Sequence, residues 1–233
     1  MKRSYELELM DLGGNDPELL GEDLRNLRFL NRYLGGSRSV LRAVQRLVAR
    51  ERLRGFSLLD VGTGSGDIPA VLAGWAKRKG VGASIVALEA EAATAQIAAD
   101  QTRRFAEITV LRGDAGAAPF SPQSFDFVVA SQLLHHFSET RIIELLQRWA
   151  KVARRAIVVS DLIRHPVAFH GIRLLTRLTT RNVMTLTDAP LSVRRALTLD
   201  EWRELFRRAA LGPVEIFSVF PFRVVAVVAL RAR

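Results

Sequence analysis

Cysteine is absent from this 233-residue sequence, which excludes disulfide bonds, thiolate ligands for metals and a cysteine nucleophile. The N-terminus is charged throughout and lacks the apolar core of a signal peptide, so we expect a cytoplasmic protein in a reducing compartment. Long apolar runs are absent too, since the longest, residues 224–230, is much shorter than the ~20 residues that a membrane-spanning helix needs. We therefore expect no membrane span, and we interpret this run as a buried strand.

Acidic residues are outnumbered by basic ones, 24 Asp and Glu against 34 Lys and Arg, which gives a formal net charge of +10. Such an excess can neutralise nucleic-acid phosphates or simply decorate a surface. The arginines are spread along predicted helices, as at Arg203, Arg207 and Arg208, and no Lys/Arg tract alternates with aromatic residues. A nucleic-acid partner is therefore not favoured, although it stays open, and the sequence does not indicate an oligomeric state.

Apolar runs alternate with helical patterns through the middle of the chain, which predicts an α/β protein. The expected strands are residues 56–61, 85–88, 108–111, 125–130, 156–159, 214–219 and 223–230. The first five are separated by stretches long enough for helical crossovers, so they should form a parallel sheet with helices on both faces. Pro221 separates the last two, which should form an antiparallel hairpin at the edge. The expected fold is thus a doubly wound, mostly parallel seven-stranded sheet.

The length suits a single domain, residues 1–233, which we divide into four segments. The expected segments are a helical N-terminal cap (1–36), a cofactor-binding core (37–161), an acceptor-side insertion (162–197) and a final helix with the edge hairpin (198–233). The insertion contains a helical run and then the irregular stretch TDAPLSVRRA. Because it follows the carboxyl end of the fifth strand, it should lie beside the cleft in which open α/β sheets bind ligands.

Three alternating glycines, Gly62, Gly64 and Gly66, lie in the stretch LLDVGTGSGD, where the first strand becomes a helix. Glycine lets the backbone turn tightly and approach a ligand closely, although an ordinary strand-to-helix turn would also explain the pattern. A dinucleotide fingerprint, G-x-G-x-x-G, would have its third glycine where this chain has Asp67. The spacing G-x-G-x-G therefore disfavours a nicotinamide cofactor.

Acidic residues follow the next two strands. Glu89 closes the second strand and could accept both hydroxyl protons of a ribose, a role that serves nicotinamide enzymes equally well. Asp114 follows the third strand in the stretch Gly113-Asp114-Ala115, where it could also be an ordinary turn residue. Their positions after adjacent strands favour a shared ligand site over two unrelated surface carboxylates.

Two adjacent histidines, His135 and His136, follow the fourth strand in the stretch SQLLHHF. Neighbouring residues of a helix point about 100° apart, so at most one imidazole should face a given ligand atom. Histidine has the pKa range for proton abstraction, but one core-packed and one exposed imidazole is an equally good interpretation. The chain has four histidines without a spacing typical of metal ligands, so no metal site is predicted.

Taken together, the stretches LLDVGTGSGD, IVALE, GDAGAAPF and SFDFVVASQLLHHF, with residues 156–164, resemble the class I S-adenosylmethionine-dependent methyltransferases. The likeness spans about residues 37–165 and is to the small-molecule branch, including enzymes of quinone and aromatic polyketide biosynthesis. The later stretch DAPLSVRRALTLDEWRELFRRAAL is similar to the acceptor-side region of a bacterial subgroup. The resemblance implies contacts with S-adenosylmethionine at Asp60, Gly62, Gly64, Gly66, Glu89, Asp114 and Ala115.

In that family the aspartate at the Asp114 position accepts the adenine amino group, and the next backbone N–H, here that of Ala115, meets the ring. Ala90 departs from the family pattern, because many relatives carry a polar turn residue after the acidic residue. This departure puts only the local turn in doubt.

The resemblance predicts transfer of a methyl group to an oxygen, in preference to a carbon, of a small hydrophobic acceptor of the phenol or quinol kind, in secondary metabolism. We expect His135 or His136 to act as general base, so that the rate rises with pH through a pKa near ~6.5. Asp188, Arg194 and Arg195 lie in the insertion, and we expect one arginine to hold an anionic or carbonyl group of the acceptor. A solvated basic pair is an equally good interpretation of the two arginines.

Three alternatives stay open. An RNA methyltransferase would share the cofactor site, but amino-directed enzymes carry an N/D-P-P-Y/F motif after the fourth strand, where residues 131–134 read SQLL. A protein of this fold could also bind the cofactor or a partner without catalysis, although the intact glycines and acidic contacts argue against a decayed site. A nicotinamide dehydrogenase is least favoured, because of the glycine spacing.

Overall fold

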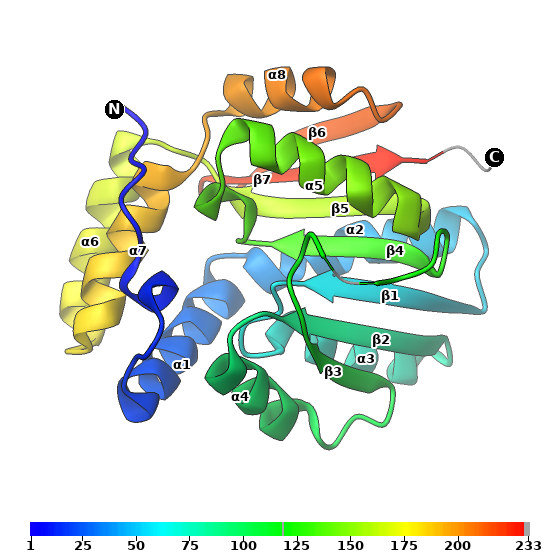
Figure 1. Cartoon of the computed structure of the whole chain (residues 1–233), viewed down its shortest axis with the longest axis horizontal. Helices are drawn as coiled ribbons and strands as arrows, with labels where there is room; N and C mark the ends of the chain where they lie inside the picture. Colours follow the sequence, from blue (N-terminus) through cyan, green and yellow to red (C-terminus); the bar gives the residue numbers. More distant parts are fainter. Residues whose placement is uncertain (118, 231–233) are drawn as a thin grey trace.

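Seven strands form one mixed sheet in the order β3-β2-β1-β4-β5-β7-β6 (Figure 1). The computed structural model describes residues 1–117 and 119–230 of the chain. The strands are β1 (Gly55–Val61), β2 (Gly82–Glu89), β3 (Ile108–Arg112), β4 (Phe125–Ser131), β5 (Ala153–Leu162), β6 (Val214–Val219) and β7 (Arg223–Ala229). Neighbouring strands are parallel except that β7 runs antiparallel to both β5 and β6. The predicted seven-stranded sheet with an antiparallel C-terminal pair is therefore confirmed.

Helices cover both faces of this sheet. They are α1 (Pro17–Tyr33), α2 (Gly36–Arg50), α3 (Asp67–Lys79), α4 (Ala92–Thr102), α5 (Glu139–Val152), α6 (Pro166–Thr179), α7 (Val183–Arg195) and α8 (Leu199–Ala209), with two 3₁₀ turns, η1 (Leu9–Leu12) and η2 (Leu134–His136). In Figure 1, α5 and α8 lie in front of the sheet and α2 and α3 behind it. Two buried apolar clusters result, one containing Trp149 and Trp202, the other Leu72 and Phe127. Because β4 is covered on both faces, its side chains are mostly apolar and buried.

The N-terminal segment, α1, α6 and α7 lie beyond the carboxyl ends of the parallel strands, on the left of Figure 1. α7 packs against α6, α1 and η1. These elements lie in the segments 1–36 and 162–197 and cover the edge where open α/β sheets bind ligands, and the roles of the two segments as cap and acceptor-side insertion stay a prediction. No described helix combines the length and apolar character required to traverse a bilayer.

Residues 183–195 form the helix α7, which includes most of the stretch 187–196 that we expected to be irregular. Asn182 caps the first turn by accepting a backbone hydrogen bond over 3.0 Å. Pro190 lies inside the helix, where proline removes a hydrogen bond and is normally unfavourable. Burial of apolar side chains such as Met184 and Leu191 offsets that loss, so packing decides the structure here.

Candidate active site

The loop between β1 and α3 contains the three alternating glycines, and each has a positive φ: 65° at Gly62, 55° at Gly64 and 75° at Gly66. A Cβ atom on Gly62 would lie only 2.7 Å from the side chain of Leu133, so a larger residue would displace Leu133 and would be strained at this positive φ. Gly64 has no atom within 4 Å of such a Cβ position, and it lines a cavity of about 370 Å³. The glycines therefore shape the loop and leave its backbone open to a ligand.

Glu89, at the end of β2, lines the same cavity as Gly62 and Gly64. Its carboxylate accepts hydrogen bonds from the backbone N–H groups of Gly64 and Ala90, both over 2.9 Å. Burial raises the pKa of Glu89, and these hydrogen bonds oppose that rise. The bonds fix the carboxylate against the glycine loop, which brings together two of the features expected to bind a ribose-containing cofactor.

Asp60, the last but one residue of β1, also lines this cavity, but its side chain is only 1% exposed. It accepts a hydrogen bond from the hydroxyl group of Thr63 over 2.6 Å. Burial, helped by the nearby carboxylates of Asp67 and Glu89, raises the pKa of Asp60 to about 8, against the lowering effect of the Thr63 hydrogen bond. The carboxyl group is therefore neutral near pH 7 and holds the first turn of the glycine loop.

Asp114 and Ala115 are not among the described residues that line the cavity. The Asp114 carboxylate is exposed and accepts a hydrogen bond from the backbone N–H of Gly116 over 2.7 Å. The carbonyl of Ala115 accepts a hydrogen bond from the indole of Trp149 over 2.9 Å. The adenine contacts expected at these two residues stay a prediction.

Both histidines of the η2 turn line the cavity, and both imidazoles lie beside the carboxylate of Glu8. The Nδ1 atom of His135 lies 2.7 Å from Asp161, near the end of β5. The Nδ1 atom of His136 lies 2.9 Å from Asp11 in η1. The ring centroids lie 4.3 Å apart, and each imidazole approaches a different carboxylate oxygen of Glu8.

His135 is surrounded by negative charge. Burial alone would lower its pKa, but the carboxylates of Asp161 and Glu8 raise it to about 10. An imidazolium cannot accept a proton, so this environment does not support the base with a pKa near ~6.5 that we expected at His135. A base at His136 stays a prediction.

The three insertion residues expected at the acceptor contact the N-terminal segment. Asp188 lines the cavity, and its carboxylate accepts hydrogen bonds from two backbone N–H groups of η1 over 2.9 and 3.1 Å. Arg195 is buried and pairs with Asp11 over 3.1 Å, whereas Arg194 is half-exposed and pairs with Glu6 over 3.7 Å. Neither arginine is among the described residues that line the two cavities, so the structure favours an anchoring role for Arg195.

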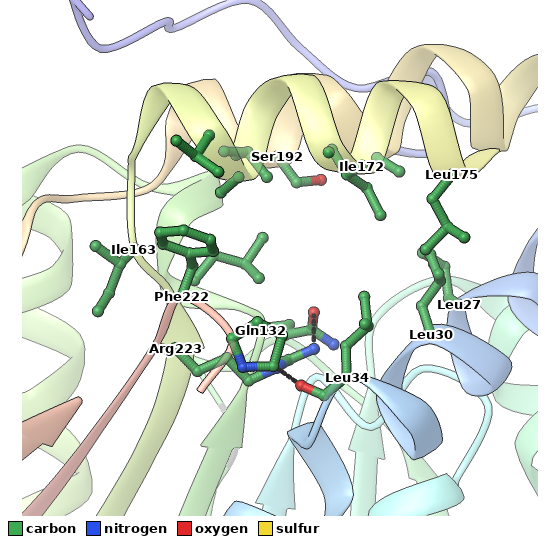
Figure 2. Close-up of a pocket in the computed structure, with 17 residues that line it drawn as sticks. Leu27, Leu30, Leu34, Gln132, Ile163, Ile172, Leu175, Ser192, Phe222 and Arg223 are labelled. Carbon is green, nitrogen blue, oxygen red and sulfur yellow. Dashed lines mark hydrogen bonds between the residues drawn. The ribbon is translucent and has the colours of Figure 1, made fainter. Parts of the chain in front are cut away.

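A second cavity, of about 310 Å³, adjoins the first, since Leu27, Gln132 and Ser192 line both. Figure 2 shows its largely apolar walls, in which Ile172 of α6 lies above the space and Leu34 below it. Arg223 lies at its floor beside Gln132 and is the only charged residue among the described residues of the lining. The cavity therefore suits a mostly apolar ligand with few polar groups.

Arg223 is held at this floor by hydrogen bonds. Its guanidinium donates to the carbonyl of Leu34 over 2.8 Å and to the side chains of Asn31 and Gln132 over 3.2 and 3.3 Å. Burial lowers the pKa of Arg223 to about 10, which leaves it positively charged near pH 7. Its charge is not matched by an ion pair within the described residues.

Residues 58–156 match the model of the methyltransferase domain family. No curated protein sequence matches the chain. The fold is similar to that of an S-adenosylmethionine-dependent methyltransferase from Aquifex aeolicus, with a TM-score of 0.65 and 16% identity over 93% of this chain and 100% of the other. It is also similar to human N-acetylserotonin methyltransferase in complex with S-adenosylmethionine, with a TM-score of 0.67 and 16% identity over 100% of this chain.

The chain covers only 63% of the length of that human protein. A third similar structure is an O-methyltransferase family 2 protein from Planctomyces limnophilus in complex with apigenin. Its TM-score is 0.53, with 18% identity over 75% of this chain and 49% of the other. At these identities the likeness shows the fold.

The matched segment contains the glycine loop, Glu89 and both histidines of η2. Residues 58–156 therefore match a methyltransferase domain, and the structures of similar fold are S-adenosylmethionine-dependent methyltransferases. The resemblance found in the sequence is confirmed at this level, and the nicotinamide alternative is not retained.

Replacement of Glu89 by alanine is expected to weaken the binding of S-adenosylhomocysteine by about 1.5–3 kcal/mol, the range for a hydrogen bond to a charged group. Isothermal titration calorimetry on the folded variant would measure this change. Glu144→Ala is the matched control, because Glu144 lies on the exposed side of α5 and should leave the affinity unchanged. An unchanged affinity in Glu89→Ala would remove Glu89 from the cofactor site.

Sequence reasoning missed four residues of this region: Glu8, Asp11, Asp161 and Arg223. Asp161 follows an apolar strand in the same way as Glu89, so the same rule about carboxyl strand ends could have found it. Glu8 and Asp11 lie in a polar segment without a motif. Arg223 begins the last strand, far in sequence from the other site residues. For these three residues no local pattern indicates the site.

Proposed function

We propose that the chain transfers the methyl group of S-adenosylmethionine to an oxygen, in preference to a carbon, of a small hydrophobic acceptor of the phenol or quinol type. The acceptor is of the kind found in quinone and aromatic polyketide biosynthesis. The observation that carries this proposal is the apolar cavity that adjoins the cofactor cavity at Leu27, Gln132 and Ser192. The complex of apigenin with a protein of similar fold is consistent with an acceptor of this size.

The methyl donor and the acceptor would bind in two separate cavities that share a wall formed by Leu27, Gln132 and Ser192. The glycine loop and Glu89 would hold the methyl donor, and α1 with α6 would enclose the acceptor. An oxygen of the acceptor would face Gln132 and the Arg223 guanidinium, which favours a hydroxyl group that is losing its proton. The apolar walls would keep water away from the sulfonium.

The reaction is an in-line displacement. The bond between sulfur and the methyl carbon breaks, its electron pair stays on sulfur, and an oxygen lone pair of the acceptor forms the new bond. Holding the two reactants in line can contribute about 7–11 kcal/mol to the lowering of the barrier. The proton of the acceptor hydroxyl leaves to a base or to water, and a base in the site would add about 10²–10⁴-fold.

Replacement of Ile172 by tryptophan is expected to fill the second cavity and to lower kcat/KM for the acceptor at least about tenfold, which corresponds to about 1.4 kcal/mol. The affinity for S-adenosylhomocysteine should not change, because Ile172 does not line the cofactor cavity. Leu174→Trp is the matched control on the same helix, since Leu174 is 61% exposed and lies outside both linings. Equal acceptor kinetics in both variants would show that the acceptor binds elsewhere.

The acceptor class itself would be tested by incubating the purified protein with methyl-labelled S-adenosylmethionine and a panel of phenols, quinols and RNA. Mass spectrometry would then locate the label. We expect label on an oxygen of a small aromatic compound. Label on RNA alone would replace the proposed acceptor by a nucleic acid, and binding of the cofactor without any transfer would indicate a non-catalytic protein.

A further inference from the structure

Three side chains of the cofactor cavity converge on one point. The Nε2 atom of His135 lies 3.6 Å from one carboxylate oxygen of Glu8, and the Nε2 atom of His136 lies 3.9 Å from the other. One ligand atom from each residue lies within 4.8 Å of the others. We call Glu8, His135 and His136 the Glu8 cluster.

The second nitrogen of each imidazole is held by a carboxylate. The Nδ1 atom of His135 contacts Asp161 over 2.7 Å, and that of His136 contacts Asp11 over 2.9 Å. A carboxylate at Nδ1 favours the tautomer with its hydrogen on that atom, which leaves a lone pair on Nε2. Metal-binding histidines in proteins commonly have this carboxylate partner, which orients the ring and raises its basicity.

Two of the converging atoms have no hydrogen-bond partner among the described residues. These are the Nε2 atom of His135 and one carboxylate oxygen of Glu8, in side chains that are 3% and 2% exposed. Unpaired buried polar atoms are unfavourable, so these two atoms need either a proton on Nε2, which makes them an ion pair over 3.6 Å, or a bound group between them. An imidazole lone pair and a carboxylate oxygen both accept, so a donor such as water or a cation suits the place between them, and the surrounding carboxylates favour the cation.

The charges around the cluster agree with this inference. Glu8, Asp11 and Asp161 bring three carboxylates, and the positive charge of Arg195 lies 3.1 Å from Asp11 and 3.8 Å from Glu8. In the metal-free protein the proton on His135 supplies part of the counter-charge, and when both imidazoles are neutral, as metal binding requires, an excess of negative charge is left in a buried place. A divalent cation would offset this excess.

We propose that Glu8, His135 and His136 bind a divalent transition-metal ion of the zinc type at the side of the cofactor cavity. Ligands about 2.1 Å from a tetrahedral zinc ion lie about 3.4 Å from one another, so the three ligand atoms, which lie within 4.8 Å of one another, would draw together on binding. Two imidazoles and one carboxylate suit zinc, cobalt or iron better than magnesium, which prefers oxygen ligands. Three protein ligands leave one position open to the cavity.

The role of this ion rests on the proposed function. The open position faces the cofactor cavity, so an acceptor hydroxyl that extends past Gln132 at the shared boundary would bind there. The ion would lower the pKa of this hydroxyl and let its proton leave to water before the oxygen attacks the methyl carbon. The ion would thus activate the acceptor, which His135, protonated in the metal-free protein, cannot do as a base. The binding of the ion can be measured without the acceptor.

The test is a titration of the metal-free protein with Zn²⁺, followed by calorimetry in a buffer that does not chelate metals, with Co²⁺ as a spectroscopic probe. We expect one equivalent to bind and Co²⁺ to give the visible absorption of a site with histidine ligands. His136→Ala and Glu8→Gln should weaken the binding at least about 10- to 100-fold, whereas Mg²⁺ should not compete with Zn²⁺. His170→Ala is the matched control, because His170 lies on the exposed side of α6 and outside the cluster.

Thermal unfolding would show whether each variant is folded, and Zn²⁺ should raise the melting temperature of the parent and of His170→Ala only. Failure of the folded parent to bind Zn²⁺ or Co²⁺ would overturn the proposal and leave an imidazolium between Asp161 and Glu8. Binding that persists in both cluster variants would also overturn it. Zinc binding without methyl transfer would contradict only the proposed function, and metal-free transfer with no zinc binding would contradict only this inference.

Discussion

Replacement of Arg195 by alanine is expected to lower the free energy of unfolding by about 3–5 kcal/mol, the usual range when one partner of a buried ion pair is removed. The side chain is buried at the end of α7, where it pairs with Asp11 and donates to the carbonyls of Glu6 and His136, both over 2.8 Å. Without the guanidinium, Asp11 and these carbonyls lose their partner together. Urea denaturation followed by circular dichroism would measure the change.

Arg194→Ala is the matched control for this experiment. Arg194 is half-exposed and pairs with Glu6 at 3.7 Å, so its loss should change the stability by less than about 0.5 kcal/mol. If Arg195→Ala instead kept the parental stability and raised the KM of the acceptor, the arginine would be an acceptor contact, as its place in the sequence first led us to expect.

Replacement of Asp60 by asparagine is expected to change how stability depends on pH. The pKa of Asp60 is about 8 in the folded protein and about 3.9 in an unfolded chain. Between these values the folded state binds one proton more than the unfolded state, so the free energy of unfolding of the parent falls by about 1.4 kcal/mol per pH unit through this group. The stability that the protonated Asp60 contributes is fully present below about pH 4, and it is lost progressively as the pH rises from there to about 8.

Asparagine keeps the shape of the neutral carboxyl group and can still accept the hydrogen bond of Thr63, but it does not ionise. The stability of Asp60→Asn relative to the parent should therefore increase between pH 5 and pH 8, by as much as about 4 kcal/mol. Urea denaturation at several pH values would measure this difference, with Asp100→Asn, on the exposed side of α4, as control. A difference that stays constant with pH would mean that Asp60 is already ionised in the folded protein.

The sequence predicted the core of the fold well because its signals are local. An apolar run such as that of β4, followed by a helical pattern, describes a buried parallel strand without reference to the rest of the chain. The positions of Gly62, Gly64 and Glu89 follow from the same rule, since the carboxyl ends of neighbouring parallel strands meet at one edge. These parts of the cofactor site could be placed before any contact was known.

The rest depends on contacts between distant segments. α7 forms in spite of Pro190 because its faces are buried against other helices, and no local propensity reports that burial. Glu8 reaches the two histidines only because the N-terminal segment folds back over η2. Arg223 reaches the second cavity because β7 lies between β5 and β6.

Leu27 of α1 contributes to the walls of both cavities, and the same helix covers the carboxyl edge of the sheet. A ligand in one cavity that restricts the motion of α1 also fixes Leu27, which forms part of the wall of the other cavity. By thermodynamic linkage, the factor by which the methyl donor changes the affinity for the acceptor equals the factor by which the acceptor changes the affinity for the donor. The cap would thus make the binding of donor and acceptor cooperative. The protein would then bind the methyl donor less tightly without the acceptor than with it.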